Sequence, residues 1–264
     1  MWIRTWAMAF AVLISVATLV MRAQVVEEDD TEILKPIAET NEPANRPDLV
    51  QAAKQIVEQT NQFREHEKLG RIATNPSLER SAQFFADFMA RTSHYGHKAN
   101  GATPADRAKK FGYEYCIVAE NIAYAYSSKG FTTEELENEF VDGWKASPGH
   151  RKNMLDPDVT DIGVAVAQGP ENGYIFAVQM FGRPKSKALE FSITNESPDT
   201  AEYKMGDRTL TLAPRHTRTH QVCRPRDLEF RWPDAEGEGR IVQPHDGDHF
   251  VVTKNGETLE LRRE

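Results

Sequence analysis

The hydrophobic pattern of the chain changes its period near residue 158, and this change limits the folds that the chain can adopt. Before it, apolar residues recur at helical spacing. After it, they alternate with other residues, as they do in strands. Helices followed by an antiparallel pair of strands predict an α+β fold, because the two kinds of element then pack as separate layers.

Four helices are expected in the first part of the chain. The first follows an apolar stripe from Leu49 to Phe63 and is expected to stop near Gly70. The second opens at Asn75-Pro76, since asparagine is a good N-cap and proline is tolerated in the first turn. The third opens at Thr103, with Asp106 as a further cap. The fourth opens at Thr132, where Glu135 completes a capping box.

The fourth helix is expected to end at Pro148-Gly149, and the segment Pro148–Pro157 is expected to be a loop. Two alternating strands follow, one around Ile162–Val166 and one around Tyr174–Met180, joined by a turn. Gly163 lies inside the first strand. We expect it to allow a close backbone approach to the preceding loop, which carries a histidine.

From about residue 187 the chain contains only short β-type runs separated by turn residues, which predicts a small all-β, sandwich-like domain over residues 187–264. The runs are Leu189–Thr194, Thr209–Leu212, Leu228–Trp232, Phe250–Thr253 and Thr258–Leu261.

The N-terminus predicts export. Arg4 precedes an apolar run from Ala7 to Met21, which is shorter than the ~20 residues of a comfortable membrane span. Residues 1–23 are therefore interpreted as a signal peptide, and an uncleaved N-terminal membrane anchor is the alternative. Residues 24–46 hold seven acidic residues and are expected to form a disordered linker.

Charge and cysteine content narrow the function. The net charge is −8 and no stretch concentrates Lys and Arg, which argues against nucleic-acid binding. The two cysteines, Cys116 and Cys223, allow either one disulfide or two buried thiols. Both alternatives remain open from the sequence.

Several segments carry a family resemblance in the correct order: NQFRE (61–65), NPSL (75–78), YGHKANGATPADRAKKFGY (95–113), AENIAYAY (119–126), GWKASPGHRKNMLDPDVTDIGVAVA (143–167) and YIFAVQMFGRP (174–184). Together they resemble the CAP/SCP superfamily of cysteine-rich secretory proteins, antigen 5 and pathogenesis-related proteins, in its bacterial form. The resemblance assigns residues 47–185 to a CAP domain and implies an α-β-α sandwich with a surface cleft.

In many members of that family two histidines and two glutamates line the cleft, and the histidines can hold a divalent metal such as zinc. Carried onto this sequence, the metal ligands are His97 and His150, with His94 as a nearby rival for His97. Glu120 matches the first glutamate and is the candidate catalytic residue, acting on metal-bound water. The alternative is that Glu120 and Asn121 only satisfy buried backbone amides where a strand ends.

The fourth cleft residue departs from the family pattern. The second glutamate normally follows the tryptophan by three residues, and here Ser147 occupies that position after Trp144. Glu139 and Asp142 lie upstream on the same helix and could approach the cleft. Trp144 itself is interpreted as a core residue whose indole N–H finds a partner.

Two function classes are favoured, and a purely structural surface protein is a third option. The first is a secreted, periplasmic or cell-surface binding module that recognises an extracellular lipid, peptide or envelope polymer. The second is a metal-dependent hydrolase of peptides or esters that uses Glu120. The sequence has no G-x-S-x-G elbow, which argues against a serine hydrolase of that type. Whether the chain is an enzyme stays open at this point.

Overall fold

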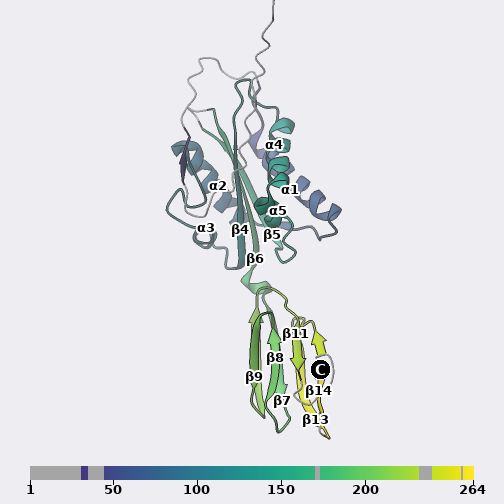
Figure 1. Ribbon diagram of the computed structural model, residues 1–264. Helices are drawn as coiled ribbons and strands as arrows, with labels where there is room; N and C mark the ends of the chain where they lie inside the picture. The colour runs from purple at the N-terminus through teal and green to yellow at the C-terminus, as the bar shows by residue number, and fades with distance from the viewer. Residues whose placement is uncertain (1–30, 35–44, 170–172, 232–239, 257) are drawn as a thin grey trace, which may run out of the picture.

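A computed structural model describes residues 31–34, 45–169, 173–231, 240–256 and 258–264. Figure 1 shows two bodies, one of helices around a sheet and one built of strands alone. The expected α+β fold class, with an all-β part at the C-terminal end, is confirmed.

The first body is an α-β-α sandwich. Its sheet has the order β2-β5-β6-β4, in which β4, β6 and β5 are antiparallel and the short β2 runs parallel to β5. Helices α1, α4 and α5 cover one face and α2 and α3 the other (Figure 1). The strands are β2 (Ala73–Thr74), β4 (Tyr115–Ala125), β5 (Asp161–Gln168) and β6 (Ile175–Pro184). The helices are α1 (Leu49–His66), α2 (Pro76–Thr92), α3 (Pro104–Lys110), α4 (Thr133–Ala146) and α5 (Pro148–Met154).

The side chains of β5 divide between two cores because successive residues of a strand point to opposite faces. Val164 and Val166 pack in the core beneath α1 and α4, whereas Ala165 and Ala167 pack in the core beneath α2. The smaller residues thus face α2, which lies closer to the sheet. Gly163 marks the closest approach: a Cβ atom there would lie 2.3 Å from backbone atoms at the start of α2. The close contact is therefore with α2, and the expected contact with the histidine-bearing segment is wrong.

The N-terminal caps agree with the sequence. The Asn75 side chain accepts a hydrogen bond at the start of α2. Thr103 with Asp106, and Thr132 with Glu135, form complete capping boxes at α3 and α4. These short-range signals locate three helix starts correctly.

Three local expectations need correction. Helix α1 ends at His66, before the expected Gly70. The chain turns two residues later, at Lys68, whose φ is 63°. The segment after Pro148 forms helix α5, where a loop was expected, with the proline in its first turn. Strand β4 was not recognised from the sequence, and Glu120 lies in its middle, paired with Met180 of β6.

The second body is a sandwich of two four-stranded sheets, ordered β10-β7-β13-β14 and β12-β11-β8-β9. Its own core contains Phe191, Tyr203, Phe230 and Phe250. The strands are β7 (Leu189–Asn195), β8 (Ala201–Met205), β9 (Arg208–Leu212), β10 (His216–Val222), β11 (Leu228–Arg231), β12 (Arg240–Val242), β13 (His249–Asn255) and β14 (Thr258–Arg263).

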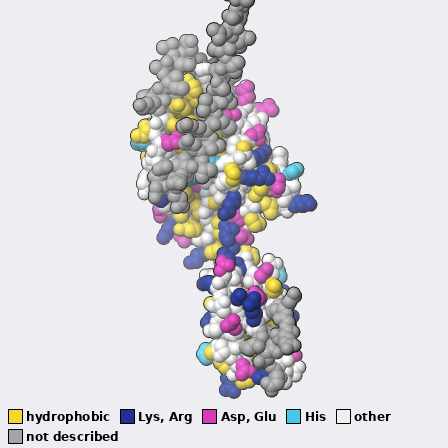
Figure 2. Space-filling model, in the orientation of Figure 1, with side chains coloured by type: hydrophobic (Ala, Val, Ile, Leu, Met, Phe, Trp, Pro, Cys, Tyr) yellow, Lys and Arg dark blue, Asp and Glu magenta, His cyan; other side chains and the backbone are white. Residues whose placement is uncertain are grey.

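The two bodies are joined covalently at two points. The chain crosses once, through the short 3-10 helix η1 (Lys185–Lys187). Cys116 in β4 and Cys223, which follows β10, form a disulfide with a Cα–Cα distance of 5.3 Å. Of the two alternatives left by the sequence, the bridge is the one observed. Figure 2 shows Lys and Arg side chains, with some Asp and Glu beside them, gathered where the two bodies meet.

The N-terminal predictions fall mostly outside the described residues, including the whole of the expected signal peptide or anchor over residues 1–23. Within the expected linker, residues 31–34 are described, and β1 (Glu32–Ile33) pairs with β3 (His94–Tyr95). Among the helices that the structure describes, none has the length and apolar character needed to cross a membrane.

Candidate functional site

His97, Glu120 and Arg107 form one polar cluster. His97 Nδ1 lies 2.8 Å from Glu120 Oε1, and Arg107 Nη2 donates to Glu120 Oε2 at 2.6 Å. The Glu120 and Arg107 side chains are each 1% exposed, whereas His97 is 22% exposed. Both oxygens of the buried carboxylate are therefore engaged, and the cluster reaches the surface through the histidine.

Arg107 holds the loop that carries His97. Its Nη1 atom donates to the backbone oxygens of His97 (3.0 Å) and Ala102 (2.6 Å), and to Asn100 Oδ1 (3.2 Å). Its guanidinium also lies 3.5 Å from the centroid of the Phe85 ring on α2. The capping box at Thr103 starts α3 and so directs Arg107 inward. One buried cation thus fixes both the carboxylate and the histidine loop.

His150 lies in the first turn of α5 and is 8% exposed. Its Nδ1 atom is buried and has no hydrogen-bond partner among the described residues. Burial, and next the charge of His97, lower the pKa of His150 to about 4. Near neutral pH this imidazole is therefore uncharged and keeps a lone pair for a ligand.

A chain of amide side chains anchors α5 to the sheet. Asn121 Nδ2 donates to His150 O (3.2 Å) and to Gln179 Oε1 (3.0 Å), and Gln179 Nε2 donates to Thr60 Oγ1 (2.8 Å). Asn153 Nδ2 donates to Asn121 Oδ1 (2.9 Å). These bonds connect α1, β6, β4 and α5, so the position of His150 is tied to the strand that carries Glu120.

The structure therefore brings the three predicted site residues into one region. His97 contacts Glu120, and His97 is close enough to His150 for its charge to affect the pKa there. His94, the rival for His97, lies in β3 with its ring 6.4 Å from that of Phe88. The expectation that Glu120 satisfies backbone amides at a strand end is wrong, since its carboxylate bonds His97 and Arg107 from the middle of β4.

The residues expected around the missing acid lie as follows. Ser147 precedes α5, and its buried Oγ has no partner among the described residues. Glu139 and Asp142 line a separate cavity of about 630 Å³ together with Lys129. Trp144 is buried, and its indole N–H donates to Ile122 O at 3.2 Å, as expected for a core residue.

The donor set fits a divalent metal only in part. No group of three or more His, Cys, Asp or Glu side chains suited to a metal is found in the described part of the chain. Two imidazoles remain, and one of them, that of His97, contacts a carboxylate through Nδ1 so that Nε2 is its other ring nitrogen. Such a pair fits a metal ion whose further ligands come from water or from a bound molecule.

The sequence did not point to Arg107, which bonds both Glu120 and the loop that carries His97. The signal available was the capping box of Thr103 and Asp106, which starts a short helix with Arg107 directly after the capping residue. Nothing local in the sequence connected that arginine to Glu120.

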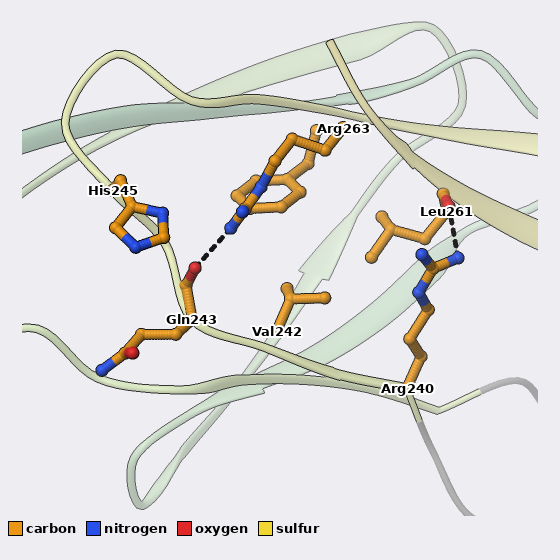
Figure 3. A pocket seen from close by; sticks show the side chains of 7 residues that line it. Arg240, Val242, Gln243, His245, Leu261 and Arg263 are labelled. Carbon is orange, nitrogen blue, oxygen red and sulfur yellow. Dashed lines mark hydrogen bonds between the residues drawn. The ribbon is translucent and has the colours of Figure 1, made fainter.

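The all-β body holds a smaller cavity of about 300 Å³ (Figure 3). Arg240 donates to Leu261 O at 2.6 Å, and Arg263 donates to Gln243 O and lies over the Phe250 ring. Both guanidinium groups are thus used to brace neighbouring strands. The cavity is lined by Arg240, Val242, Gln243, His245, Phe250, Leu261 and Arg263.

The chain is similar in sequence to known proteins. The sequence model of the cysteine-rich secretory protein family, CAP, matches residues 57–181. The uncharacterized protein YkwD of Bacillus subtilis is 35% identical over 146 residues, which cover 54% of this chain and 52% of YkwD. The match thus spans about half the length of that relative. An uncharacterized protein of Borreliella burgdorferi is 26% identical over 126 residues, covering 48% of this chain and 75% of that protein.

Two solved structures are also similar. One is an outer surface protein from Borrelia burgdorferi, with 21% identity and a TM-score of 0.46, covering 52% of this chain and 96% of that one. The other is an extracellular protein containing an SCP domain from Bacillus anthracis, with 24% identity and a TM-score of 0.41, covering 51% and 41%.

The helical body is thus a CAP domain with a histidine–glutamate cluster. Residues 57–181 match the CAP family model, and this part of the chain has bacterial relatives.

Proposed function

We propose that the chain is an exported binding module. In this proposal His97 and His150 hold a divalent metal such as zinc, and the surface around them recognises an extracellular lipid, peptide or envelope polymer. One observation carries the proposal: a buried carboxylate with both oxygens engaged orients His97 beside the uncharged, buried His150.

The roles of the residues follow from their partners. Glu120 accepts from His97 Nδ1 and so fixes the ring orientation and the tautomer that leaves Nε2 free to bind a ligand. Arg107 bonds the second oxygen of Glu120 and so holds the carboxylate in the position where its first oxygen contacts His97. His150 supplies the second nitrogen. A bound metal would supply a Lewis-acid centre for a carbonyl, carboxylate or phosphate oxygen of the partner.

Export is supported by two features of this chain. The apolar run after Arg4 has the length of a signal-peptide core. The disulfide between Cys116 and Cys223 is of a kind that persists mainly in oxidising compartments outside the cytosol. A retained N-terminal segment would anchor the protein to a membrane, and a cleaved one would release it.

Metal binding is tested with untagged protein by calorimetric titration with zinc. We expect one ion per chain for the wild type and at least a tenfold loss of affinity in His97→Ala and in His150→Ala. His94→Ala is the matched control and should bind as the wild type does. Equal affinity in all four proteins, or no zinc binding by the wild type, would overturn the metal part of the proposal.

The alternative is a metal-dependent hydrolase in which Glu120 acts as the general base. The observation that favours it is the position of Glu120 directly beside a candidate ligand. The burial of Glu120 counts against it, because a general base must reach a water molecule and this side chain is 1% exposed with both oxygens hydrogen-bonded. Chelator-sensitive cleavage of a peptide or ester library that is lost in folded Glu120→Gln would establish the alternative. Absence of turnover by the zinc-loaded protein would leave the binding module.

A further inference from the structure

Strand β5 has a long open edge in the described part of the chain. On one side β6 pairs with β5 along its whole length, from Asp161 to Gln168. On the other side β2 pairs only with Asp161 and Ile162. From Gly163 onward, no described strand lies next to that outer edge.

The direction of the backbone groups follows from one hydrogen bond. Asn75 N donates to Ile162 O at 2.9 Å, so the backbone groups of Ile162 point away from β6. The backbone N–H and C=O groups of successive residues in a strand point alternately to its two edges. Those of Val164 and Val166 therefore point away from β6, as those of Ile162 do. Their N–H and C=O groups therefore form a ladder that faces away from the sheet.

This edge forms the floor of a groove of about 470 Å³ between α1 and α2, which we call the α1–α2 groove. Val164 and Val166 are 8% and 5% exposed, so the edge is recessed between the two helices. The groove is lined by Leu49, Val50, Ala53, Lys54, Val57, Thr74, Glu79, Arg80, Gln83, Val164 and Val166.

The recessed position of the β5 edge limits which molecules can bind in the α1–α2 groove. A second copy of this chain carries its own α1 and α2 beside the same edge, and those helices would meet before the strands reach the ~4.8 Å spacing of a sheet. An acyl chain would contact the apolar walls but would leave the outward N–H and C=O groups without partners. A single extended polypeptide fits between the helices and pairs with the ladder.

The rim of the groove indicates the charge of that polypeptide. Lys54 on α1 makes no ion pair with any described residue. Arg80 on α2 donates only to uncharged oxygens, those of Ser77 Oγ and Phe111 O. Glu79 is the one acidic residue in the lining. Two cations from the two opposite walls favour a partner with acidic side chains.

We propose that the α1–α2 groove captures an extended, acidic polypeptide segment of a partner protein, which adds to β5 as a neighbouring strand. Apolar side chains on one face of the segment would lie against Ala53 and Val57. Acidic side chains would lie near Lys54 and Arg80. The groove shares no residue with the histidine site, so this binding does not depend on the proposed metal.

The test uses a library of acetylated octapeptides in which Val, Ile and Thr alternate with Asp and Ser. Binders selected on the wild-type protein are measured by titration and by amide hydrogen exchange. We expect them to slow exchange at the Val164 and Val166 amides. Lys54→Glu and Arg80→Glu should each weaken binding about tenfold, as expected when a charge-assisted contact is lost. Lys152→Glu, on α5 and outside the groove, is the control and should bind as the wild type does.

A matched peptide separates strand addition from filling of the groove by side chains alone. N-methylation of the edge-facing amides keeps every side chain and removes the donors, and it should reduce affinity by about tenfold or more. The proposal is overturned by a library without binders, by N-methylated peptides that bind equally well, or by binders that leave Val164 and Val166 unprotected. Binding of a fatty acid in the groove, without peptide binding, would also overturn it.

Discussion

Arg224 of the all-β body holds Asp156 of the CAP domain through two hydrogen bonds, Nη1 to Oδ1 at 2.8 Å and Nη2 to Oδ2 at 2.6 Å. The same guanidinium reaches Asp158 Oδ2 at 2.7 Å. Both carboxylates belong to the segment between α5 and β5. Arg64 of α1 donates to the backbone oxygen of Asp156 at 2.9 Å from the other side. The segment that follows the His150 helix is therefore held from both bodies.

Replacing Arg224 tests this contact. Burial raises the pKa of Asp156, but hydrogen bonds from Arg224 and from the backbone outweigh it and hold the pKa below its usual value. Arg224→Ala should lower the free energy of unfolding by about 1 kcal/mol, a discounted value because the side chain is 40% exposed. Chemical denaturation near neutral pH measures it.

Arg231→Ala is the control, since Arg231 pairs with Glu229 within one strand and at higher exposure. A loss no larger than that of the control would contradict a stabilising role for Arg224. The stabilisation depends on ionised Asp156. It is present above the unfolded pKa of that group, and it should disappear as the pH falls through the lowered folded pKa.

Acid should destabilise the CAP domain through His150. The folded state keeps this imidazole neutral down to a pKa of about 4, whereas the unfolded chain takes up a proton near 6.5. The unfolded state thus binds more protons between these values, and stability falls as the pH drops from 6.5 to 4, by up to about 3 kcal/mol.

The measurement is the free energy of unfolding against pH for the wild type and for His150→Gln. The glutamine variant should lack this part of the slope. Identical pH profiles for the two proteins would contradict the assignment to His150.

Breaking the buried ion pair should affect both stability and metal affinity. Arg107→Gln leaves Glu120 charged and buried with one partner fewer, which should cost about 3–5 kcal/mol of folding free energy. It also loosens the His97 loop, so zinc affinity should fall about 10- to 100-fold in the protein that remains folded.

Glu120→Gln separates the effect on stability from the effect on zinc affinity. It removes the buried carboxylate charge and keeps an amide oxygen that can still accept a hydrogen bond. If Arg107→Gln bound zinc as tightly as the wild type, Arg107 would have a structural role only.

A pair of glycines provides a test of the packing between α2 and the sheet. In Gly163→Ala the added Cβ would lie 2.3 Å from backbone atoms of Leu78 and Glu79, so α2 must shift, and we expect a loss of about 1–3 kcal/mol. Gly149→Ala adds a Cβ with no atom within 4 Å, inside α5, and should be neutral or stabilise by up to about 1 kcal/mol. Thermal unfolding compares them, and equal stability of the two variants would contradict the close approach.

Features coded over short distances were predictable from the sequence. The caps at Asn75, Thr103 and Thr132 depend on neighbouring residues, and so does the alternation of Ile162, Val164 and Val166. Strand β4 was missed because it is covered on both faces and carries Glu120 and Asn121, so it lacks a clear alternation of apolar and polar residues. Helix α5 was not expected because Pro148-Gly149 is typical of the end of a helix. Proline is, however, also favoured in the first turn of a helix.

The candidate site, too, was predictable from the sequence only in part. The family resemblance pointed to His97, Glu120 and His150, which no local pattern connects. Arg107 could not be assigned, because its partner lies on a strand that the sequence did not reveal. Contacts between segments far apart in the chain depend on sheet register, and register is decided by packing in the whole domain.

The disulfide gives the molecule a closed covalent loop, since Cys116 and Cys223 are separated by 107 positions and η1 is the peptide crossing between the two bodies. A protease that cuts the chain once at Lys185 or Lys187 would therefore not release the all-β body. The nicked protein would keep both halves together until a reductant opened the bridge. Outside the cell, where proteases are common and thiols are scarce, such a chain tolerates a break at its most exposed crossing without losing its second body.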